Sequence, residues 1–281
     1  MGDLALDTEI EGSDGRYQGR PSDEWAIWGP MGGYIAAFAL RAAGAHSGLA
    51  RPAAFSCHFL SVAAFDTIDI EATTLRASKR AASTRVAISQ EGRPVLEAIV
   101  WSVAGASPGL DHDHAAMPDV PGHHGLKTIR ELVKPDDEPP FPFWKNFDGK
   151  PLHWLPYEEW IKRPAGEPVW REWLRFSPTA TFEDPYVDAA RLLIVADVAS
   201  WPSAVQAHTH DVGFIAPNLD VNVQFHRDAR GEEWLLADGF SAVAEDGLVG
   251  FRSQVWSDAG RLLASGAGQL LCRAVPSPAD R

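Results

Sequence analysis

An acidic residue inside an apolar run is the first position of this sequence that could do chemistry. Asp197 follows the run Leu192-Leu-Ile-Val-Ala196, which predicts a buried helix. A carboxylate held in an apolar helix has a raised pKa, and that suits a general base that takes a proton from water. The structural alternative is that Asp197 caps a helix or forms an ion pair, as an acid in a helix more often does.

A strand with polar side chains on one face follows this helix. Apolar and polar residues alternate strictly here, and a period of two predicts a strand. The polar positions are Asn218, Asp220, Asn222, Gln224 and His226, and the apolar ones are Leu219, Val221, Val223 and Phe225. We expect the acid to face this polar row, which would make a hydrolytic site. Asp220 shares the predicted face of Asn218, so it is a candidate for contact with substrate or for a structural role.

Composition narrows the class of protein. The chain has 281 residues, 45% of them hydrophobic, and a formal net charge of −13. An acidic chain is a poor match for nucleic acid, which requires a basic surface. The N-terminus has no basic stretch before an apolar core, and no window approaches the roughly 18 apolar residues of a membrane span. We therefore expect a cytoplasmic protein, in which Cys57 and Cys272 are reduced and packed in apolar strands.

The sequence repeats one order of elements. An alanine-rich helix from Gly32 to about Gly44 precedes four predicted strands, and Glu91-Gly92 is predicted to be a hairpin turn between two of them. The helix that contains Asp197 is likewise followed by strands. The matching positions are Phe59 and Phe225 at an offset of 166, Arg85 and Arg252 at 167, and Gly92-Arg93 and Gly260-Arg261 at 168.

This near-constant offset predicts two copies of one α+β fold, each a central helix wrapped by an antiparallel sheet. We expect the copies to span residues 1–107 and 166–275. In the first copy, Pro30 or Met31 stands at the place that matches Asp197, so only the second copy could supply this base.

The segment from 108 to 165 is predicted to be a linker. It begins with a stretch rich in Pro, Gly, Asp and His, which is typical of a surface linker. The next part mixes prolines with aromatics, so it cannot be a helix throughout and is too aromatic to be disordered. The histidines of this segment are His112, His114, His123 and His124, and a further pair is His208 and His210. Because no Cys or Glu at ligand spacing accompanies them, we expect solvated loop histidines and no metal site.

Several short motifs together resemble the type II acyl-CoA thioesterases, which have two tandem hotdog domains. The motifs are Trp28-Gly-Pro-Met-Gly-Gly-Tyr34, His58-Phe-Leu60, Ala196-Asp197, Leu219-Asp220, Phe225-His-Arg227, Glu233-Trp-Leu-Leu236 and Asp258-Ala-Gly-Arg-Leu-Leu-Ala-Ser265. Each motif is short, so the resemblance rests on their order and spacing. It covers most of the chain outside the linker.

The resemblance implies a thioester hydrolase in which an Asp, a Thr or Ser and a Gln hold the attacking water. There is then no covalent intermediate and no cofactor, and acyl-CoA is the substrate. The Asp corresponds to Asp197, and the Thr or Ser position is occupied by Asn218. An ungapped alignment places Gly268 where the Gln is expected, and we expect a bulge at Gly266 or Gly268 to return Gln269 to the site. By analogy, the resemblance also implies a homo-oligomer.

The thioester carbonyl requires hydrogen-bond donors. We expect backbone N–H groups at helix starts to supply them, from Gly32 and Gly33 in the first copy and from Val198 in the second. The acyl chain is expected in an apolar tunnel between the two central helices, lined by Trp25, Trp28, Phe38 and Trp201. The phosphates of CoA would pair with local Arg or Lys.

Two other functions compete with thioester hydrolysis. A hydratase on the same fold would need a His about five residues after the Asp, and position 202 is Pro. A protein that binds acyl thioesters or lipids without hydrolysis is the second alternative, favoured by Asn218 and the displaced Gln. The serine-hydrolase motif G-x-S-x-G does not occur in the sequence.

Overall fold

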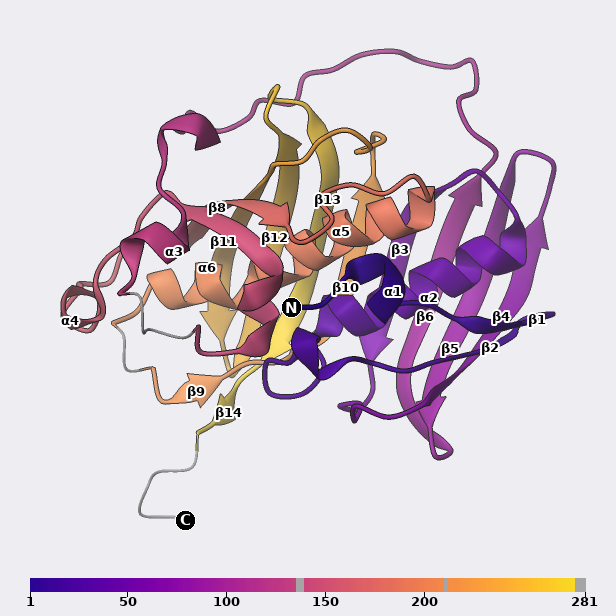
Figure 1. Ribbon diagram of the computed structural model, residues 1–281, viewed down its shortest axis with the longest axis horizontal. Helices are drawn as coiled ribbons and strands as arrows, with labels where there is room; N and C mark the ends of the chain where they lie inside the picture. The colour runs from indigo at the N-terminus through magenta and orange to yellow at the C-terminus, as the bar shows by residue number, and fades with distance from the viewer. Residues whose placement is uncertain (135–138, 210–211, 276–281) are drawn as a thin grey trace.

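The computed structural model describes residues 1–134, 139–209 and 212–275 (Figure 1). Its α-helices are α1 (Leu4–Asp7), α2 (Gly32–Ser47), α3 (Ile129–Leu132), α4 (Tyr157–Trp160), α5 (Pro185–Val198) and α6 (Ser200–Gln206). Short 3₁₀ helices are η1 (Asp23–Trp25), η2 (His123–Gly125) and η3 (Pro142–Asn146).

The strands before the linker are β1 (Glu11–Ser13), β2 (Arg16–Gly19), β3 (Arg51–Phe59), β4 (Ile68–Ala77), β5 (Ala81–Gln90) and β6 (Arg93–Val103). The strands within the linker and after it are β7 (Phe147–Pro151), β8 (Val169–Phe176), β9 (Phe214–Ile215), β10 (Asn218–Phe225), β11 (Leu235–Glu245), β12 (Leu248–Ser257), β13 (Leu262–Leu271) and β14 (Arg273–Ala274). The predicted hairpin turn at Glu91-Gly92 joins β5 to β6, and both of its residues have positive φ.

One antiparallel sheet of twelve strands runs through the described chain, in the order β1-β2-β4-β5-β6-β3-β10-β13-β12-β11-β8-β7. The order is symmetric about the β3–β10 pair, because β4, β5, β6 and β3 occupy the same relative places as β11, β12, β13 and β10. At this centre Ser56 pairs with Asn222. Their numbers differ by 166, the offset between Phe59 and Phe225 in the sequence. The predicted pair of hotdog units in an α+β fold is confirmed.

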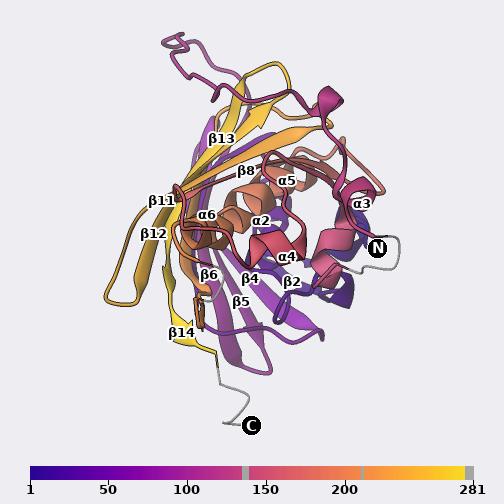
Figure 2. The same cartoon turned by 90° about the vertical axis from the view of Figure 1, so that its left-hand side faces the viewer.

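The two central helices lie together on one side of this sheet (Figures 1 and 2). Almost every residue of α5 is buried, and so is most of α2, as their apolar sequences require. Glycines let the two helices approach closely: a Cβ on Gly33 would lie 3.0 Å from the Cβ of Asp197, and one on Gly44 would lie 2.6 Å from the ring of Tyr186.

These two helix contacts correct the expected match to Asp197. With an offset of 153 between α2 and α5, Gly33 corresponds to Tyr186 and Gly44 corresponds to Asp197. The contact of Gly33 with Asp197 is then equivalent to the contact of Tyr186 with Gly44. The counterpart of Asp197 is then Gly44, and not Pro30 or Met31. The error arises because α6 and the loop after it lengthen the connection from α5 to β10, so the offset of the strands does not apply to the helices.

The predicted linker contributes more to the fold than a surface loop. Its strand β7 pairs with β8 at the end of the sheet, and Phe143 and Phe147 are buried in the main core. Met117, Val120 and Leu126 cover a second apolar cluster on the sheet, formed by Trp173, Leu236 and Trp256. Phe143 and Phe147 of this segment are therefore core residues.

Candidate active site

Asp197 lies in the last turn of α5, where it faces the first turn of α2. Its side chain is 4% exposed. The backbone N–H of Gly33 donates a hydrogen bond of 2.7 Å to its Oδ2, and the Nδ2 of Asn218 donates to its Oδ1. The carboxylate therefore receives one donor from each half of the repeat.

Burial dominates the acidity of this carboxylate. It raises the pKa of Asp197 to about 6, while the hydrogen bonds from Gly33 and Asn218 oppose the rise. A group with this pKa is mostly ionised at neutral pH and is a stronger base than an exposed aspartate. The raised pKa expected for an acid in an apolar helix is confirmed.

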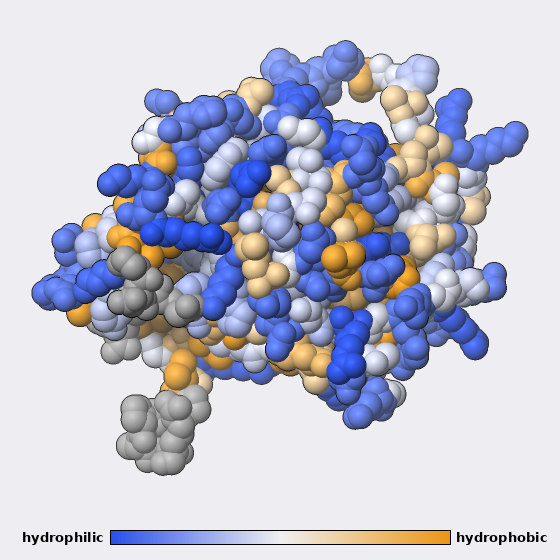
Figure 3. Space-filling view, in the orientation of Figure 1, coloured by the Kyte–Doolittle hydropathy of each residue, from blue (hydrophilic) through white to orange (hydrophobic). Residues whose placement is uncertain are grey.

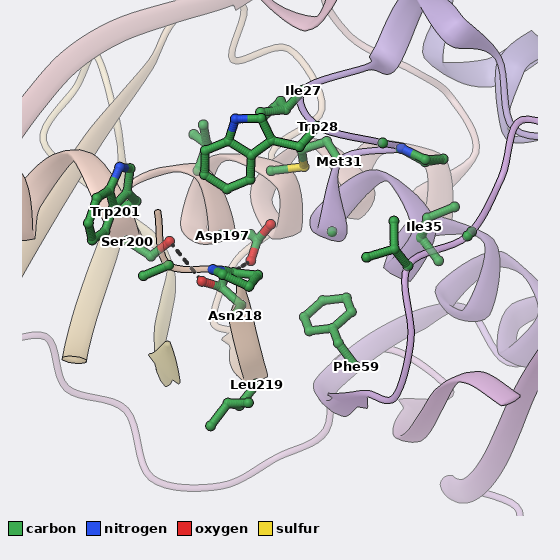
Figure 4. Close-up of a pocket in the computed structure, with 18 of the residues that line it drawn as sticks. Ile27, Trp28, Met31, Ile35, Phe59, Asp197, Ser200, Trp201, Asn218 and Leu219 are labelled. Carbon is green, nitrogen blue, oxygen red and sulfur yellow. Dashed lines mark hydrogen bonds between the residues drawn. The ribbon is translucent and has the colours of Figure 1, made fainter. Parts of the chain in front are cut away.

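A β-bulge brings Asn218 to Asp197. The register of β10 against β13 shifts between Asn218 and Asp220. Asn218 turns toward the helix and accepts a hydrogen bond of 3.2 Å from the Oγ of Ser200, so that Ser200, Asn218 and Asp197 form a chain of hydrogen bonds (Figure 4).

Of the predicted polar row, Asn218 faces the acid, but the bulge turns the rest of the row away from it. Beyond the bulge, Val221 and Val223 are the buried residues, whereas Asn222 and Gln224 are exposed. Asp220 does not line the cavity at Asp197. It accepts a hydrogen bond from the side chain of Asn222 and one from the backbone N–H of Gln269.

Gln269 is not brought to the site. Strands β10 and β13 pair without interruption from Asp220 opposite Gln269 to Phe225 opposite Ala264, so the bulge expected at Gly266 or Gly268 does not form. Gln269 is exposed. The residue on the inner face is Gly268, where a Cβ would lie 2.9 Å from the ring of buried Phe251.

The predicted backbone donors divide into two kinds. Gly32 and Gly33 begin α2, and the N–H groups of a first helical turn have no acceptor within the helix. Gly33 uses its N–H on Asp197, and Gly32 lines the adjacent cavity. Val198 also lines the cavity, but it is the last residue of α5. Carbonyl groups are the free ones there, so its expected role as a donor is wrong.

A cavity of about 400 Å³ opens beside Asp197. Its walls come from the start of α2, the end of β3 with the loop after it, the α5–α6 junction and the start of β10, and they are mainly apolar. Trp28 and Trp201 line it as predicted, and Trp28, which is 50% exposed, lies at its edge (Figure 4).

Two of the expected wall residues lie elsewhere. Trp25 and Phe38 are fully buried and do not line this cavity. Both pack on Tyr34, with ring centroids at 5.0 Å for Trp25 and 5.5 Å for Phe38. Trp25 of η1 and Phe38 of α2 are core residues, and the prediction of a tunnel lined by them is wrong.

Sequence reasoning missed several residues of the cavity. Ser200 stands three positions after Asp197, a spacing that places two helical residues on one face, so it could have been found. Phe141 and Trp144 reach the cavity from the linker, and Arg273 reaches it from the segment after β13. No local pattern marks these three, because the tertiary fold alone brings them together.

The histidines of the linker differ in their surroundings. His112, His114 and His124 are exposed, as predicted, but His123 is buried and stacks on Trp234 at 4.8 Å. Its Nε2 lies 3.4 Å from Asp258, so the prediction of a solvated loop residue is wrong for His123. Of the other pair, His210 lies outside the described residues.

Comparison with known proteins agrees with this architecture. A hotdog-fold protein of unknown function from Alicyclobacillus acidocaldarius is 20% identical, with a TM-score of 0.81, covering 97% of this chain and 98% of that one. An acyl-CoA thioesterase II from Mycobacterium marinum is also 20% identical, with a TM-score of 0.76 and coverage of 97% and 99%. These likenesses define the fold as a double hotdog. A search of curated protein sequences finds no match.

Family sequence models then place the chain. The acyl-CoA thioesterase N-terminal domain matches residues 21–103, and the acyl-CoA thioesterase C-terminal domain matches residues 114–271. The chain belongs to the acyl-CoA thioesterase family and is a thioester hydrolase. Within the described residues, no helix is long and apolar enough to cross a membrane.

Proposed function

We propose that this protein hydrolyses acyl-CoA to a free acid and CoA by means of a water molecule activated by Asp197. The observation that supports the proposal best is the buried Asp197 carboxylate, held between Gly33 and Asn218 at the wall of an apolar cavity. Each carboxylate oxygen has two lone pairs, so both can accept these hydrogen bonds and still leave room for a water.

The reaction follows from this arrangement. Ionised Asp197 takes a proton from water while the water oxygen attacks the thioester carbonyl carbon. The carbonyl oxygen becomes negative, and we propose that the N–H of Gly32 at the start of α2 stabilises it. When the C–S bond breaks, the sulfur leaves as a thiolate and receives a proton, which Asp197 can return.

Gly268 occupies the position at which the family resemblance implies a glutamine. With Gly268 on the inner face and Gln269 exposed, we propose that Asn218, fixed by Ser200, orients the base without help from β13. Apolar aromatic side chains would enclose the acyl group. Arg273 at the same cavity is the residue that we propose to meet the phosphates of CoA.

The test is thiol release from a panel of acyl-CoA esters that differ in chain length. Asp197→Asn keeps the shape of the side chain and removes the base, so we expect kcat to fall by about 100-fold or more while the KM changes little. Gln269→Ala is the matched control, and it should keep full activity. Full turnover by Asp197→Asn would overturn the mechanism. Binding without turnover by the wild type would instead indicate an acyl-thioester binding protein.

A further inference from the structure

The structure contains a second cavity, of about 280 Å³, at the other end of the α2–α5 pair. Its walls come from the start of α5, the start of β3, the end of β10 and the residues after β6. These are the counterparts of the elements that line the cavity at Asp197. It is the second of two cavities that the repeat produces.

The match extends to single positions. With the helix offset of 153, Gly32 and Ile35 of the first cavity correspond to Pro185 and Asp188 of the second. With the strand offset of 166, the further pairs are Phe59 with Phe225, Ser61 with Arg227, Val62 with Asp228, and Pro217 with Arg51. All of these residues line their respective cavities.

The second cavity cannot perform the proposed reaction. Gly44 replaces the base, and the ring of Tyr186 lies over it, 2.6 Å from the place of a Cβ. A carboxylate at position 44 would have no room. Whatever this cavity binds is therefore not hydrolysed by the chemistry of Asp197.

Charged residues line this cavity at positions where the first cavity has neutral ones. Arg51, Arg227 and Arg230 line it together with Asp188 and Asp228. In a chain with a formal net charge of −13, a cavity with more cations than anions is unusual and favours an anionic ligand.

The carboxylates around the cavity are already paired. Asp188 is held by the buried guanidinium of Arg191 at 2.6 Å, and Asp228 pairs with Arg230 at 2.5 Å. Arg227 pairs with Asp113 of the linker at 2.8 Å.

Arg51 differs from the other two arginines that line this cavity, both of which pair with a carboxylate. Within the described residues it makes no ion pair, and its Nη1 donates only to the carbonyl of Pro52, at 3.2 Å. Nearby Asp228 accepts hydrogen bonds from the Arg230 guanidinium at both of its oxygens. Most of the donors of the Arg51 guanidinium are therefore free for a ligand.

We propose that this cavity is a non-catalytic site for a phosphate-bearing anion, with Arg51 as its principal contact. A guanidinium binds phosphate oxygens through two parallel hydrogen bonds, and the neighbouring arginines add to the field. The proposal concerns binding alone and does not depend on hydrolysis at Asp197. The phosphate could come from inorganic pyrophosphate or from the nucleotide part of CoA.

The test measures binding of pyrophosphate to the full chain by titration calorimetry. We expect Arg51→Gln to weaken binding about tenfold or more, which is the loss of one charge-assisted contact. Arg51→Lys keeps the charge without the planar fork and should show a smaller loss, which guards against misfolding of the first variant. Arg130→Gln is the matched control, since α3 lies against β7 at the far end of the sheet.

Further ligands and variants locate the site. Arg273→Gln alters the cavity at Asp197, so the pyrophosphate binding that depends on Arg51 should keep its affinity in this variant. ADP and CoA should compete with pyrophosphate, whereas pantetheine should not, and tighter competition by CoA would identify its nucleotide as the source. No binding of pyrophosphate at millimolar concentration, or binding that depends on Arg273 and not on Arg51, would overturn the proposal.

Discussion

The pKa of Asp197 is set by two opposing effects: burial favours the neutral acid, and hydrogen bonds favour the carboxylate. Because burial wins, the pKa of Asp197 is raised to about 6, and the base is ionised only above that pH. We expect kcat/KM to fall tenfold per pH unit below about pH 6 and to level off above pH 7.

Replacement of Asn218 tests whether Asp197 sets the pH dependence of kcat/KM. Donation by Asn218 to Oδ1 lowers the pKa of Asp197, so Asn218→Ala should move the acidic limb to higher pH as well as reduce the plateau. Gln224→Ala on the exposed face of β10 should leave the limb in place. A pH profile that is identical in the wild type and Asn218→Ala would contradict the assignment of the limb to Asp197.

The same raised pKa has a consequence for stability. The folded state holds the proton of Asp197 more tightly than the unfolded state, so this group's contribution is fully present below the unfolded pKa of 3.8 and is lost as pH rises through about 6. The complete loss is roughly 3 kcal/mol, from the difference between the two pKa values.

Asp197→Asn cannot ionise and therefore escapes this loss. We expect the free energy of unfolding of the variant, relative to the wild type, to rise by roughly 2.5 kcal/mol between pH 4 and pH 8, which is the part of the loss that falls in this range. Denaturant titrations at both pH values would measure the change. A relative stability that does not vary with pH would show that the carboxylate is not buried as described.

At the scale of elements, the contact between α2 and α5 sets the position of the base. A Cβ on Gly33 would lie 3.0 Å from both the Cβ of Asp197 and the Cα of Ile194, so Gly33→Ala must push the two helices apart. Overpacking of this kind costs about 1–3 kcal/mol, and kcat/KM should fall because Asp197 moves with its helix.

Gly44→Ala is the control for that variant, because the repeat places it in the equivalent contact, against Tyr186. Thermal unfolding should show a comparable loss of stability in both variants, whereas only Gly33→Ala should lose substantial activity. Equal activity losses would mean that general destabilisation, and not displacement of Asp197, explains the effect.

Element patterns explain what the sequence could predict. The apolar character of the two central helices predicts that they are buried, and the near-constant offset of 166–168 predicts the repeated strands, because both patterns depend on local burial. The bulge at Leu219 was not predictable, since Asn218-Leu219-Asp220 continues a regular alternation. It depends on pairing with β13, and it decided that Asn218 faces Asp197 while Asp220 does not. The family resemblance suggested a glutamine, but uninterrupted pairing leaves Gln269 outside.

At the scale of the whole molecule, the negative charge works against a polyanionic substrate. Hydrophilic side chains dominate the face seen in Figure 3, and the formal net charge is −13. CoA must therefore approach through a locally cationic place. Arg273 lies at the cavity that contains Asp197 and makes no ion pair within the described residues.

Arg273→Gln should therefore distinguish two substrates with the same acyl group. For acyl-CoA we expect kcat/KM to fall about tenfold, since one charge-assisted contact with phosphate is lost. For the corresponding acyl-pantetheine thioester, which has the same thioester and no nucleotide, kcat/KM should be unchanged. Arg130→Gln changes the net charge equally and should affect neither substrate. Equal losses on both substrates would place Arg273 at the acyl group or in the fold, and not at the phosphates.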